Sequence, residues 1–162
     1  MAATVGSVQS QLDQFAAEFA SQVPQEVREV MERAGNRVDE IIAGQAVLDV
    51  DAQARDFELP DASGRMVNSS ELLQKGPLVL TFYRGGWCPY CNIELRALQA
   101  ALPEIKSLGA SLVAVSPETP DQSLSISEKN ELEFSVLSDV GNKVAKQYGL
   151  VFSLPEELRP IY

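Results

Sequence analysis

The first 45 residues carry apolar side chains at the spacing of an α-helix. One stripe repeats every three or four residues from Val8 to Val23, and a second follows from Val27 to Ile42. This spacing predicts two amphipathic helices, with Pro24 in the first turn of the second and Gly44 as its end. We expect the helices to form a hairpin whose apolar faces pack on the rest of the chain or on a second copy.

Beyond a linker at residues 45–55, apolar residues gather in short runs that alternate with further helical stripes. The run from Pro77 to Tyr83 is almost continuously apolar, which predicts a strand buried on both faces. Strands that alternate with helices predict an α/β fold with a parallel sheet. The expected elements are a hairpin at 56–67 with Gly64 in its turn, a helical turn at 69–73, strands at 77–83, 110–116 and 134–137, and helices at 89–107, 123–131 and 140–148. We therefore expect a helical extension at residues 1–45 and an α/β domain at residues 46–162.

Composition and charge narrow the possible functions. The chain has 162 residues, 45% of them apolar, and a net charge of −10. Because an acidic surface repels phosphate backbones and anionic lipid, we expect neither nucleic acid nor a membrane as partner. No stretch approaches the roughly 20 apolar residues that cross a bilayer. The first residues lack the basic and apolar segments of a signal peptide, so we expect a cytoplasmic protein.

The chain has no histidine and only two cysteines, Cys88 and Cys91. The absence of histidine excludes Ser–His–Asp and Cys–His catalysis and removes the commonest metal ligand. Two cysteines three residues apart cannot cross-link a secreted fold, so the Cys-x-x-Cys motif predicts redox chemistry in a reducing compartment. A tetrahedral zinc site would need two chains to share the metal. We expect no metal and no other cofactor.

The two cysteines fall between a predicted strand and the start of a predicted helix. Helix N-termini favour anions, and thiols in thioredoxin-type sites have a pKa of about 7 instead of about 8.5. If Cys88 caps the helix, Cys91 lies one turn on and can form a reversible disulfide with it. Trp87, Pro89 and Tyr90 frame the turn, so we expect exposed sulfurs. Buried structural thiols and half of a zinc site are the alternatives.

The segment Thr81–Leu98, which reads TFYRGGWCPYCNIELRAL, resembles the active-site segment of the peroxiredoxin-like branch of the AhpC/TSA redoxins. Asp56–Asp61, Val115–Glu118 and Phe134–Asp139 resemble other landmarks of that family, so the likeness covers roughly residues 54–148. The resemblance implies a thioredoxin-like fold. It also implies a thiol-dependent peroxidase that acts on hydrogen peroxide or organic hydroperoxides and is regenerated by thioredoxin or glutathione.

The segment also departs from the family pattern, which is Pro-x-x-x-Thr-x-x-Cys. Arg84 stands at the proline position and Cys88 at the threonine position, whereas Cys91 keeps the place of the attacking cysteine. Thioredoxins attack with the first cysteine instead, and Thr81 stands where they carry a buried acid. The sequence leaves open which sulfur attacks. A thiol–disulfide oxidoreductase and a non-catalytic redox sensor or scaffold remain alternatives to the peroxidase.

Charged and aromatic residues flank the two cysteines. We expect Arg84 and Trp87 to bind the substrate, with Arg84 stabilising a thiolate or orienting a peroxide. Arg96 is a weaker candidate for the same role. The alternatives are that Arg84 is an ordinary loop charge and that Arg96 pairs with a neighbour on its helix. Glu94, in the first helical turn, would oppose thiolate formation.

The family's fold continues with further strands and a closing helix, which this sequence does not contain before Tyr162. In that fold, strand 77–83 is central, with 110–116 on one side and a missing strand on the other. Unpaired backbone groups on a buried edge are costly. We therefore expect either a truncated form or a homodimer in which the N-terminal helices or a swapped segment cover this edge.

Overall fold

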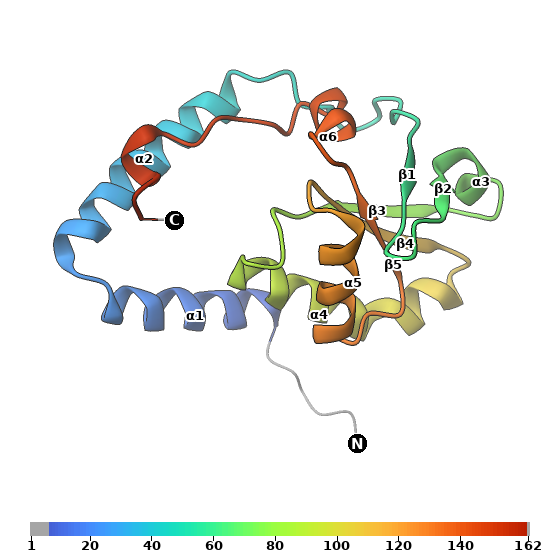
Figure 1. The fold of residues 1–162 in the computed structure, drawn as a ribbon, viewed down its shortest axis with the longest axis horizontal. Helices are drawn as coiled ribbons and strands as arrows, with labels where there is room; N and C mark the ends of the chain where they lie inside the picture. The colour runs from blue at the N-terminus through green and yellow to red at the C-terminus, as the bar shows by residue number, and fades with distance from the viewer. Residues whose placement is uncertain (1–6, 162) are drawn as a thin grey trace. The chain divides into compact units, whose positions relative to one another are not determined.

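The computed structural model describes residues 7–161, which divide into two compact units. One unit is Ala54–Ala145, which contains the sheet and both cysteines. The other combines the residues up to Gln53 with those from Lys146 onward. Figure 1 shows the elements of both. The functional residues expected from the sequence all lie in the first of these units.

A three-stranded parallel sheet forms the centre of the unit Ala54–Ala145. Its strands are β3 (Leu78–Phe82), β4 (Ser111–Ser116) and β5 (Ser135–Ser138), in the order β3-β4-β5. Val79 of β3 pairs with Leu112 of β4. The predicted strands and their parallel arrangement are confirmed (Figure 1).

The expectation that strand 77–83 is buried on both faces is wrong. β3 is only partly buried, and Val79 is 37% exposed, whereas β4 is buried from Leu112 to Ser116. β4 lies between two strands and β5 is also contacted by β1, whereas β3 has only one neighbouring strand in the described part of the chain. No strand within residues 7–161 pairs with the other edge of β3.

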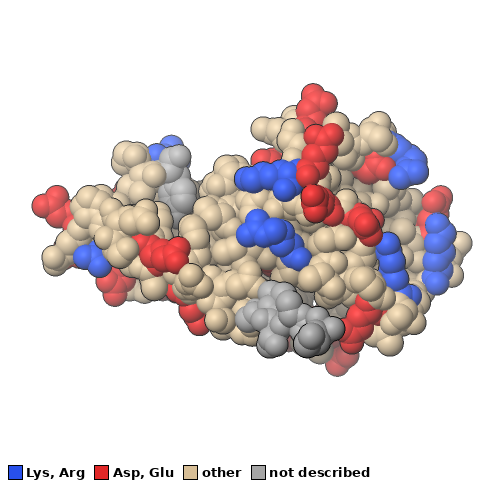
Figure 2. Space-filling model, turned by 90° about the horizontal axis from the view of Figure 1, so that it is seen from below, with Lys and Arg blue, Asp and Glu red and all other residues tan. Residues whose placement is uncertain are grey.

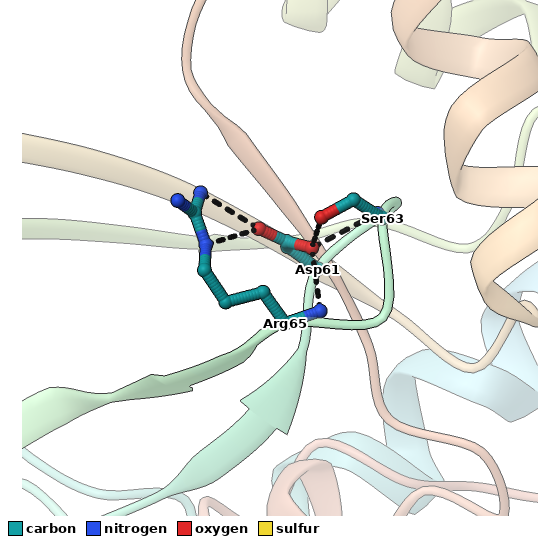
Figure 3. A network of polar contacts seen from close by, with 3 residues as sticks. All are labelled: Asp61, Ser63 and Arg65. Atoms are coloured by element: carbon teal, nitrogen blue, oxygen red, sulfur yellow. Dashed lines mark hydrogen bonds and ion pairs between the residues drawn. The ribbon is translucent and has the colours of Figure 1, made fainter.

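The predicted hairpin precedes the sheet. β1 (Glu58–Pro60) and β2 (Met66–Asn68) are antiparallel, and α3 (Ser69–Leu73) follows directly. Gly64 lies in the turn with φ +82°, a conformation that suits glycine. Figure 3 shows the Asp61 carboxylate accepting hydrogen bonds from the backbone and side chains of two later turn residues, Ser63 and Arg65.

Three helices accompany the sheet. α4 (Pro89–Ser107) has the predicted bounds. α5 (Pro120–Lys129) begins three residues earlier than predicted, because Pro120 suits the first helical position. α6 (Lys143–Gln147) is shorter than predicted, because the buried Asp139 carboxylate accepts the amides of its first three residues and fixes its start.

The core lies where α4 packs against β4 and α5 against β5. Its buried cluster includes both cysteines. The other members are Tyr83, Leu95, Leu102, Leu112, Ala114, Ile126, Phe134 and Val136.

The second unit contains the two predicted N-terminal helices, α1 (Val8–Gln22) and α2 (Gln25–Ala43). α1 buries none of its residues and makes no extended contact with α2, so the pair has no shared core. α2 packs instead against η1 (Glu156–Leu158), a 3₁₀ helix that the sequence did not predict. Between residues 7 and 161, no helix combines the length and apolar character needed to cross a membrane. On the face drawn in Figure 2, acidic and basic side chains are interspersed.

Asp61 allows a test of what holds the hairpin turn. Burial raises the pKa of its carboxyl, but the hydrogen bonds from Ser63 and Arg65 outweigh burial and hold this pKa below its ordinary value. Asp61→Ala should therefore lower the free energy of unfolding at pH 7 by about 1–3 kcal/mol, as measured by urea denaturation. Because the folded pKa is depressed, this stability is present above the unfolded pKa of about 3.9 and is lost as the pH falls through the folded value.

The stability gap between wild type and Asp61→Ala should thus close at acidic pH. Asp39→Ala, which removes an exposed carboxylate on α2, is the matched control and should change little at any pH. A gap that stays constant down to pH values well below the ordinary pKa would contradict this account of Asp61.

Candidate active site

The cysteines lie at the junction between β3 and α4. The connecting turn contains Gly85, with φ +149°, and the carbonyl of Gly85 accepts the amide of Cys88 at 3.1 Å. A Cβ atom on Gly85 would lie 2.5 Å from the indole nitrogen of Trp87 and 3.0 Å from a carboxylate oxygen of Glu118. Both the backbone angle and the lack of space therefore require glycine here.

Cys88 is the N-cap of α4, as the sequence predicted. Its backbone is extended, and its sulfur accepts the amide of Cys91 at 3.4 Å. Pro89 occupies the first helical position, where an N–H group would have no partner within the helix. The thiol of Cys88 therefore lies at the positive end of the helix dipole.

The Arg84 side chain contacts the same sulfur. Its Nη2 atom donates to Cys88 Sγ at 3.1 Å, and its guanidinium lies 5.1 Å from the centre of the Trp87 ring. The structure thus brings Arg84, Trp87 and Cys88 together. A cation that donates a hydrogen bond to sulfur favours the thiolate over the thiol.

The other two charged candidates lie elsewhere. The Arg96 guanidinium donates to Asn130 Oδ1 at 3.1 Å, at the end of α5. Glu94 is exposed and accepts the hydroxyl of Thr81 at 3.5 Å. The expectation that Arg96 serves the thiolate directly is therefore not met, since its guanidinium binds a side chain of the neighbouring helix.

The prediction of exposed sulfurs is wrong. Cys88 is 0% exposed and Cys91 is 7% exposed, whereas the Trp87 side chain beside them is 58% exposed. The sulfurs face inward because Cys88 and Cys91 continue the buried stripe of α4 that includes Leu95. Both thiols are free. The zinc alternative gains no support, since no group of three or more potential ligands gathers in the part of the chain that the structure describes.

The two thiols have opposite electrostatic environments. Burial raises the pKa of Cys88, but hydrogen bonds from the Cys91 thiol, the Cys91 amide and the Arg84 guanidinium outweigh burial and hold this pKa below its ordinary value. Burial raises the pKa of Cys91, and the proton that its thiol donates to Cys88 raises it further. Cys88 is therefore the sulfur that ionises first.

Three further polar residues hold the turn and were not identified from the sequence. Asn92 and Asn130 are buried, and Glu118 accepts the amide of Gly86. Asn92 could have been identified from the sequence, because it is a polar residue that falls in the apolar stripe of α4, one position after Cys91. Glu118 and Asn130 lie far away in the sequence, and no local pattern marked them.

The family model that matches the chain is described as the AhpC/TSA family and covers residues 50–160. Peroxiredoxin Q of the Sedum lineare chloroplast is 34% identical over 58% of this chain and 50% of its own length. Peroxiredoxin Bcp of Escherichia coli K12 is 31% identical over 58% of this chain and 60% of its own. The crystal structure of peroxidoxin BcpB from Mycobacterium tuberculosis is 33% identical over 60% of this chain and 64% of that one, with a TM-score of 0.58.

These matches span half to about two thirds of each relative. The family model includes the α/β unit Ala54–Ala145 with its Cys-x-x-Cys turn, and the structural match confirms the thioredoxin-like fold. The family model alone covers more than half of this chain. The protein is therefore a member of the AhpC/TSA family, and the named relatives that it resembles are peroxiredoxins.

Proposed function

We propose that this protein is a thiol-dependent peroxidase in which Cys88 attacks the peroxide and Cys91 resolves the product. The observation that carries the proposal is the sulfur of Cys88, which accepts hydrogen bonds from the Arg84 guanidinium at 3.1 Å and the Cys91 amide at 3.4 Å. The family pattern places the attacking cysteine at Cys91 instead. We assign the attack to Cys88 because its pKa is lowered and that of Cys91 is raised, and the thiolate is the nucleophile.

The first chemical step oxidises one sulfur. The Cys88 thiolate attacks one peroxide oxygen, an S–O bond forms, the O–O bond breaks, and the leaving hydroxide or alkoxide takes a proton. Cys88 becomes a sulfenic acid. Arg84 then stabilises both the thiolate before attack and the negative charge that develops on the leaving oxygen.

The second step forms a disulfide. The Cys91 sulfur attacks the sulfenic sulfur, an S–S bond forms, the S–O bond breaks, and water leaves. An external dithiol then reduces the Cys88–Cys91 disulfide, and we propose thioredoxin or glutathione for this role. Such a cycle needs a reducing compartment, which supports a cytoplasmic location.

Access to the sulfur restricts the substrate. Because Cys88 is 0% exposed, a peroxide can reach it only when side chains of the turn move. Trp87 is the exposed aromatic residue of the turn, and Arg84 lies over its ring. We propose that these two residues bind the substrate, and that hydrogen peroxide or a small organic hydroperoxide is favoured over a bulky one.

Thiol–disulfide exchange on proteins is the second candidate. It is favoured by the lowered pKa of the first cysteine in the motif, which is the cysteine that attacks in thioredoxins. Both reactions use the sulfurs of Cys88 and Cys91, so the two reactions differ only in the substrate that is reduced, a peroxide or a protein disulfide.

A homodimer is consistent with two surfaces of the chain. α1 buries none of its residues, and no strand among residues 7–161 pairs with the free edge of β3. We propose that a second copy covers one or both surfaces, and that residues 1–45 act as a helical extension of a redoxin domain at residues 46–162.

Substitution of Arg84 tests the origin of the thiolate. Arg84→Gln removes the cation from Cys88 Sγ, so the pKa of Cys88 should rise and less thiolate should be present at pH 7. We expect the pH midpoint of iodoacetamide alkylation to rise by about one unit. At pH values below this midpoint, the shift corresponds to a tenfold decrease in the fraction of thiolate. Arg28→Gln, on α2, is the control of equal charge change. Superimposable alkylation profiles for wild type and Arg84→Gln would exclude this role.

Cysteine variants test the order of attack and the class of reaction. Cys91→Ser should consume one equivalent of peroxide and stop at the sulfenic acid, whereas Cys88→Ser should consume none. Wild type should turn over with a thioredoxin–NADPH system. If Cys88→Ser rather than Cys91→Ser retains the single turnover, the assigned order is reversed. If wild type reduces insulin but consumes peroxide no faster than a free thiol, the second candidate is correct, and inactivity in both assays would favour a sensor or scaffold.

Light scattering tests the dimer. We expect twice the chain mass at micromolar concentration, and a smaller mass or aggregation after deletion of residues 1–45. A full-length monomer that remains folded and monomeric after this deletion would refute the proposed dimer.

A further inference from the structure

The carboxamide of Asn92 joins two peptide groups of the cysteine turn. Its Nδ2 atom donates to the carbonyl of Gly86 at 3.0 Å and to the carbonyl of Cys88 at 2.8 Å. The residue is 6% exposed, so water does not compete for these contacts. The first turn of α4 is thereby tied to the loop that precedes it.

Two further residues hold Asn92 in place. Asn130, the residue at which α5 ends, donates from Nδ2 to Asn92 Oδ1 at 2.9 Å and to the carbonyl of Ile126 at 3.1 Å. Arg96, one turn beyond Asn92 on α4, donates from Nη1 to Asn130 Oδ1 at 3.1 Å. Arg96, Asn130 and Asn92 thus form a continuous chain of hydrogen bonds from the protein surface to the turn, which we call the carboxamide relay.

Residues outside the relay hold the other side of the same peptide. The amide of Gly86 donates to both carboxylate oxygens of Glu118, each at 3.0 Å. A Cβ atom on Gly86 would lie 3.1 Å from Ile126 Cδ1, so α5 approaches the turn closely at this point. Gly86 is therefore bound through its N–H group by Glu118 and through its carbonyl by Asn92.

The relay leaves no polar atom of its two buried carboxamides without a partner. Such groups are costly to bury unless all their donors and acceptors are satisfied. Removal of one member therefore leaves a buried polar atom of the next member without a hydrogen-bond partner, which is unfavourable. Because each member fixes the orientation of the next, a change at Arg96 or Asn130 reaches the carbonyls of Gly86 and Cys88.

We infer that the carboxamide relay is a positioning device for the redox turn, through which the end of α5 sets the reactivity of Cys88. This inference rests on the proposed function only for the role of the Cys88 thiolate, which is to attack a peroxide. The side-chain amide of Asn92 binds the carbonyls of Gly86 and Cys88 and thereby keeps Cys88 at the cap of α4. In that position its sulfur receives the amide of Cys91 and the guanidinium of Arg84. The hydrogen bonds of the relay join its side chains to one another and to the carbonyls of Gly86 and Cys88, so the relay acts on the sulfur through the backbone.

The experiment measures the pH dependence of Cys88 alkylation by iodoacetamide, followed by mass spectrometry, in the full chain without peroxide. Asn130→Ala interrupts the relay without touching the turn. We expect its alkylation midpoint to rise by about half to one pH unit, a three- to tenfold loss of thiolate at pH 7. Arg96→Gln, at the exposed end, should shift the midpoint in the same direction and provides the test if Asn130→Ala fails to fold.

Two controls separate the relay from general effects. Gln99→Ala removes another α4 hydrogen bond, to the amide of Glu133 at 2.9 Å, and should leave the midpoint unchanged. Lys129→Gln removes one positive charge from the last turn of α5, next to Asn130, and should also leave the midpoint unchanged. The inference is overturned if Lys129→Gln shifts the midpoint as Arg96→Gln does, since the effect is then one of charge, or if Gln99→Ala shifts the midpoint equally. It is also overturned if Arg96→Gln alkylates with the wild-type profile.

This readout is independent of peroxide consumption. If the wild-type protein has no peroxidase activity, the proposed function is excluded, but the inference about the carboxamide relay still stands. Conversely, an active enzyme whose relay variants all alkylate like wild type would retain the proposed function and exclude the relay.

Discussion

The hydrogen bond from the amide of Cys91 to the sulfur of Cys88, at 3.4 Å, exists because α4 begins at Pro89 and leaves Cys88 as its cap. The other residues of the site position the Cys88 sulfur and its hydrogen-bond donors. β3 delivers the chain to the turn, and Gly85 reverses it in a backbone conformation that other residues rarely adopt. The turn brings Arg84 back over the sulfur, so that a helix N-terminus and a guanidinium act on one atom.

Burial opposes the charge that these donors stabilise. Cys88 has no exposed surface and belongs to the same buried cluster as Leu95 and Ile126. Desolvation alone would raise the pKa of the Cys88 thiol, and three hydrogen bonds together with the positive charge of Arg84 reverse its effect. A thiolate held in this way is sensitive to small displacements of its donors. This sensitivity is the physical basis of the effect that we infer for the carboxamide relay, which reaches the sulfur only through the backbone of the turn.

The pair of sulfurs also divides its roles by geometry. Cys91 donates its proton to Cys88, which lowers the pKa of the first thiol and raises that of the second. In the proposed cycle, the first sulfur is thereby prepared as the nucleophile, and the second remains protonated until a disulfide is to be formed. The AhpC/TSA family pattern places the attacking cysteine at the Cys91 position, and Arg84 and Cys88 are the departures from that pattern on which the proposed attack by Cys88 rests.

Local patterns were sufficient to predict much of this protein. The start of α4 at Pro89, and with it the capping position of Cys88, depends on residues within three or four positions of one another, and the sequence predicted it. The strands and their parallel order also followed from runs of apolar residues. The sequence favoured Arg84 over Arg96 as the partner of the thiolate, but it did not predict that the sulfurs are buried or that Glu118 and Asn130 hold the turn. These features depend on how α4 lies against α5 and on which strand occupies the edge of the sheet, and such packing between distant segments is decided only when the whole chain folds.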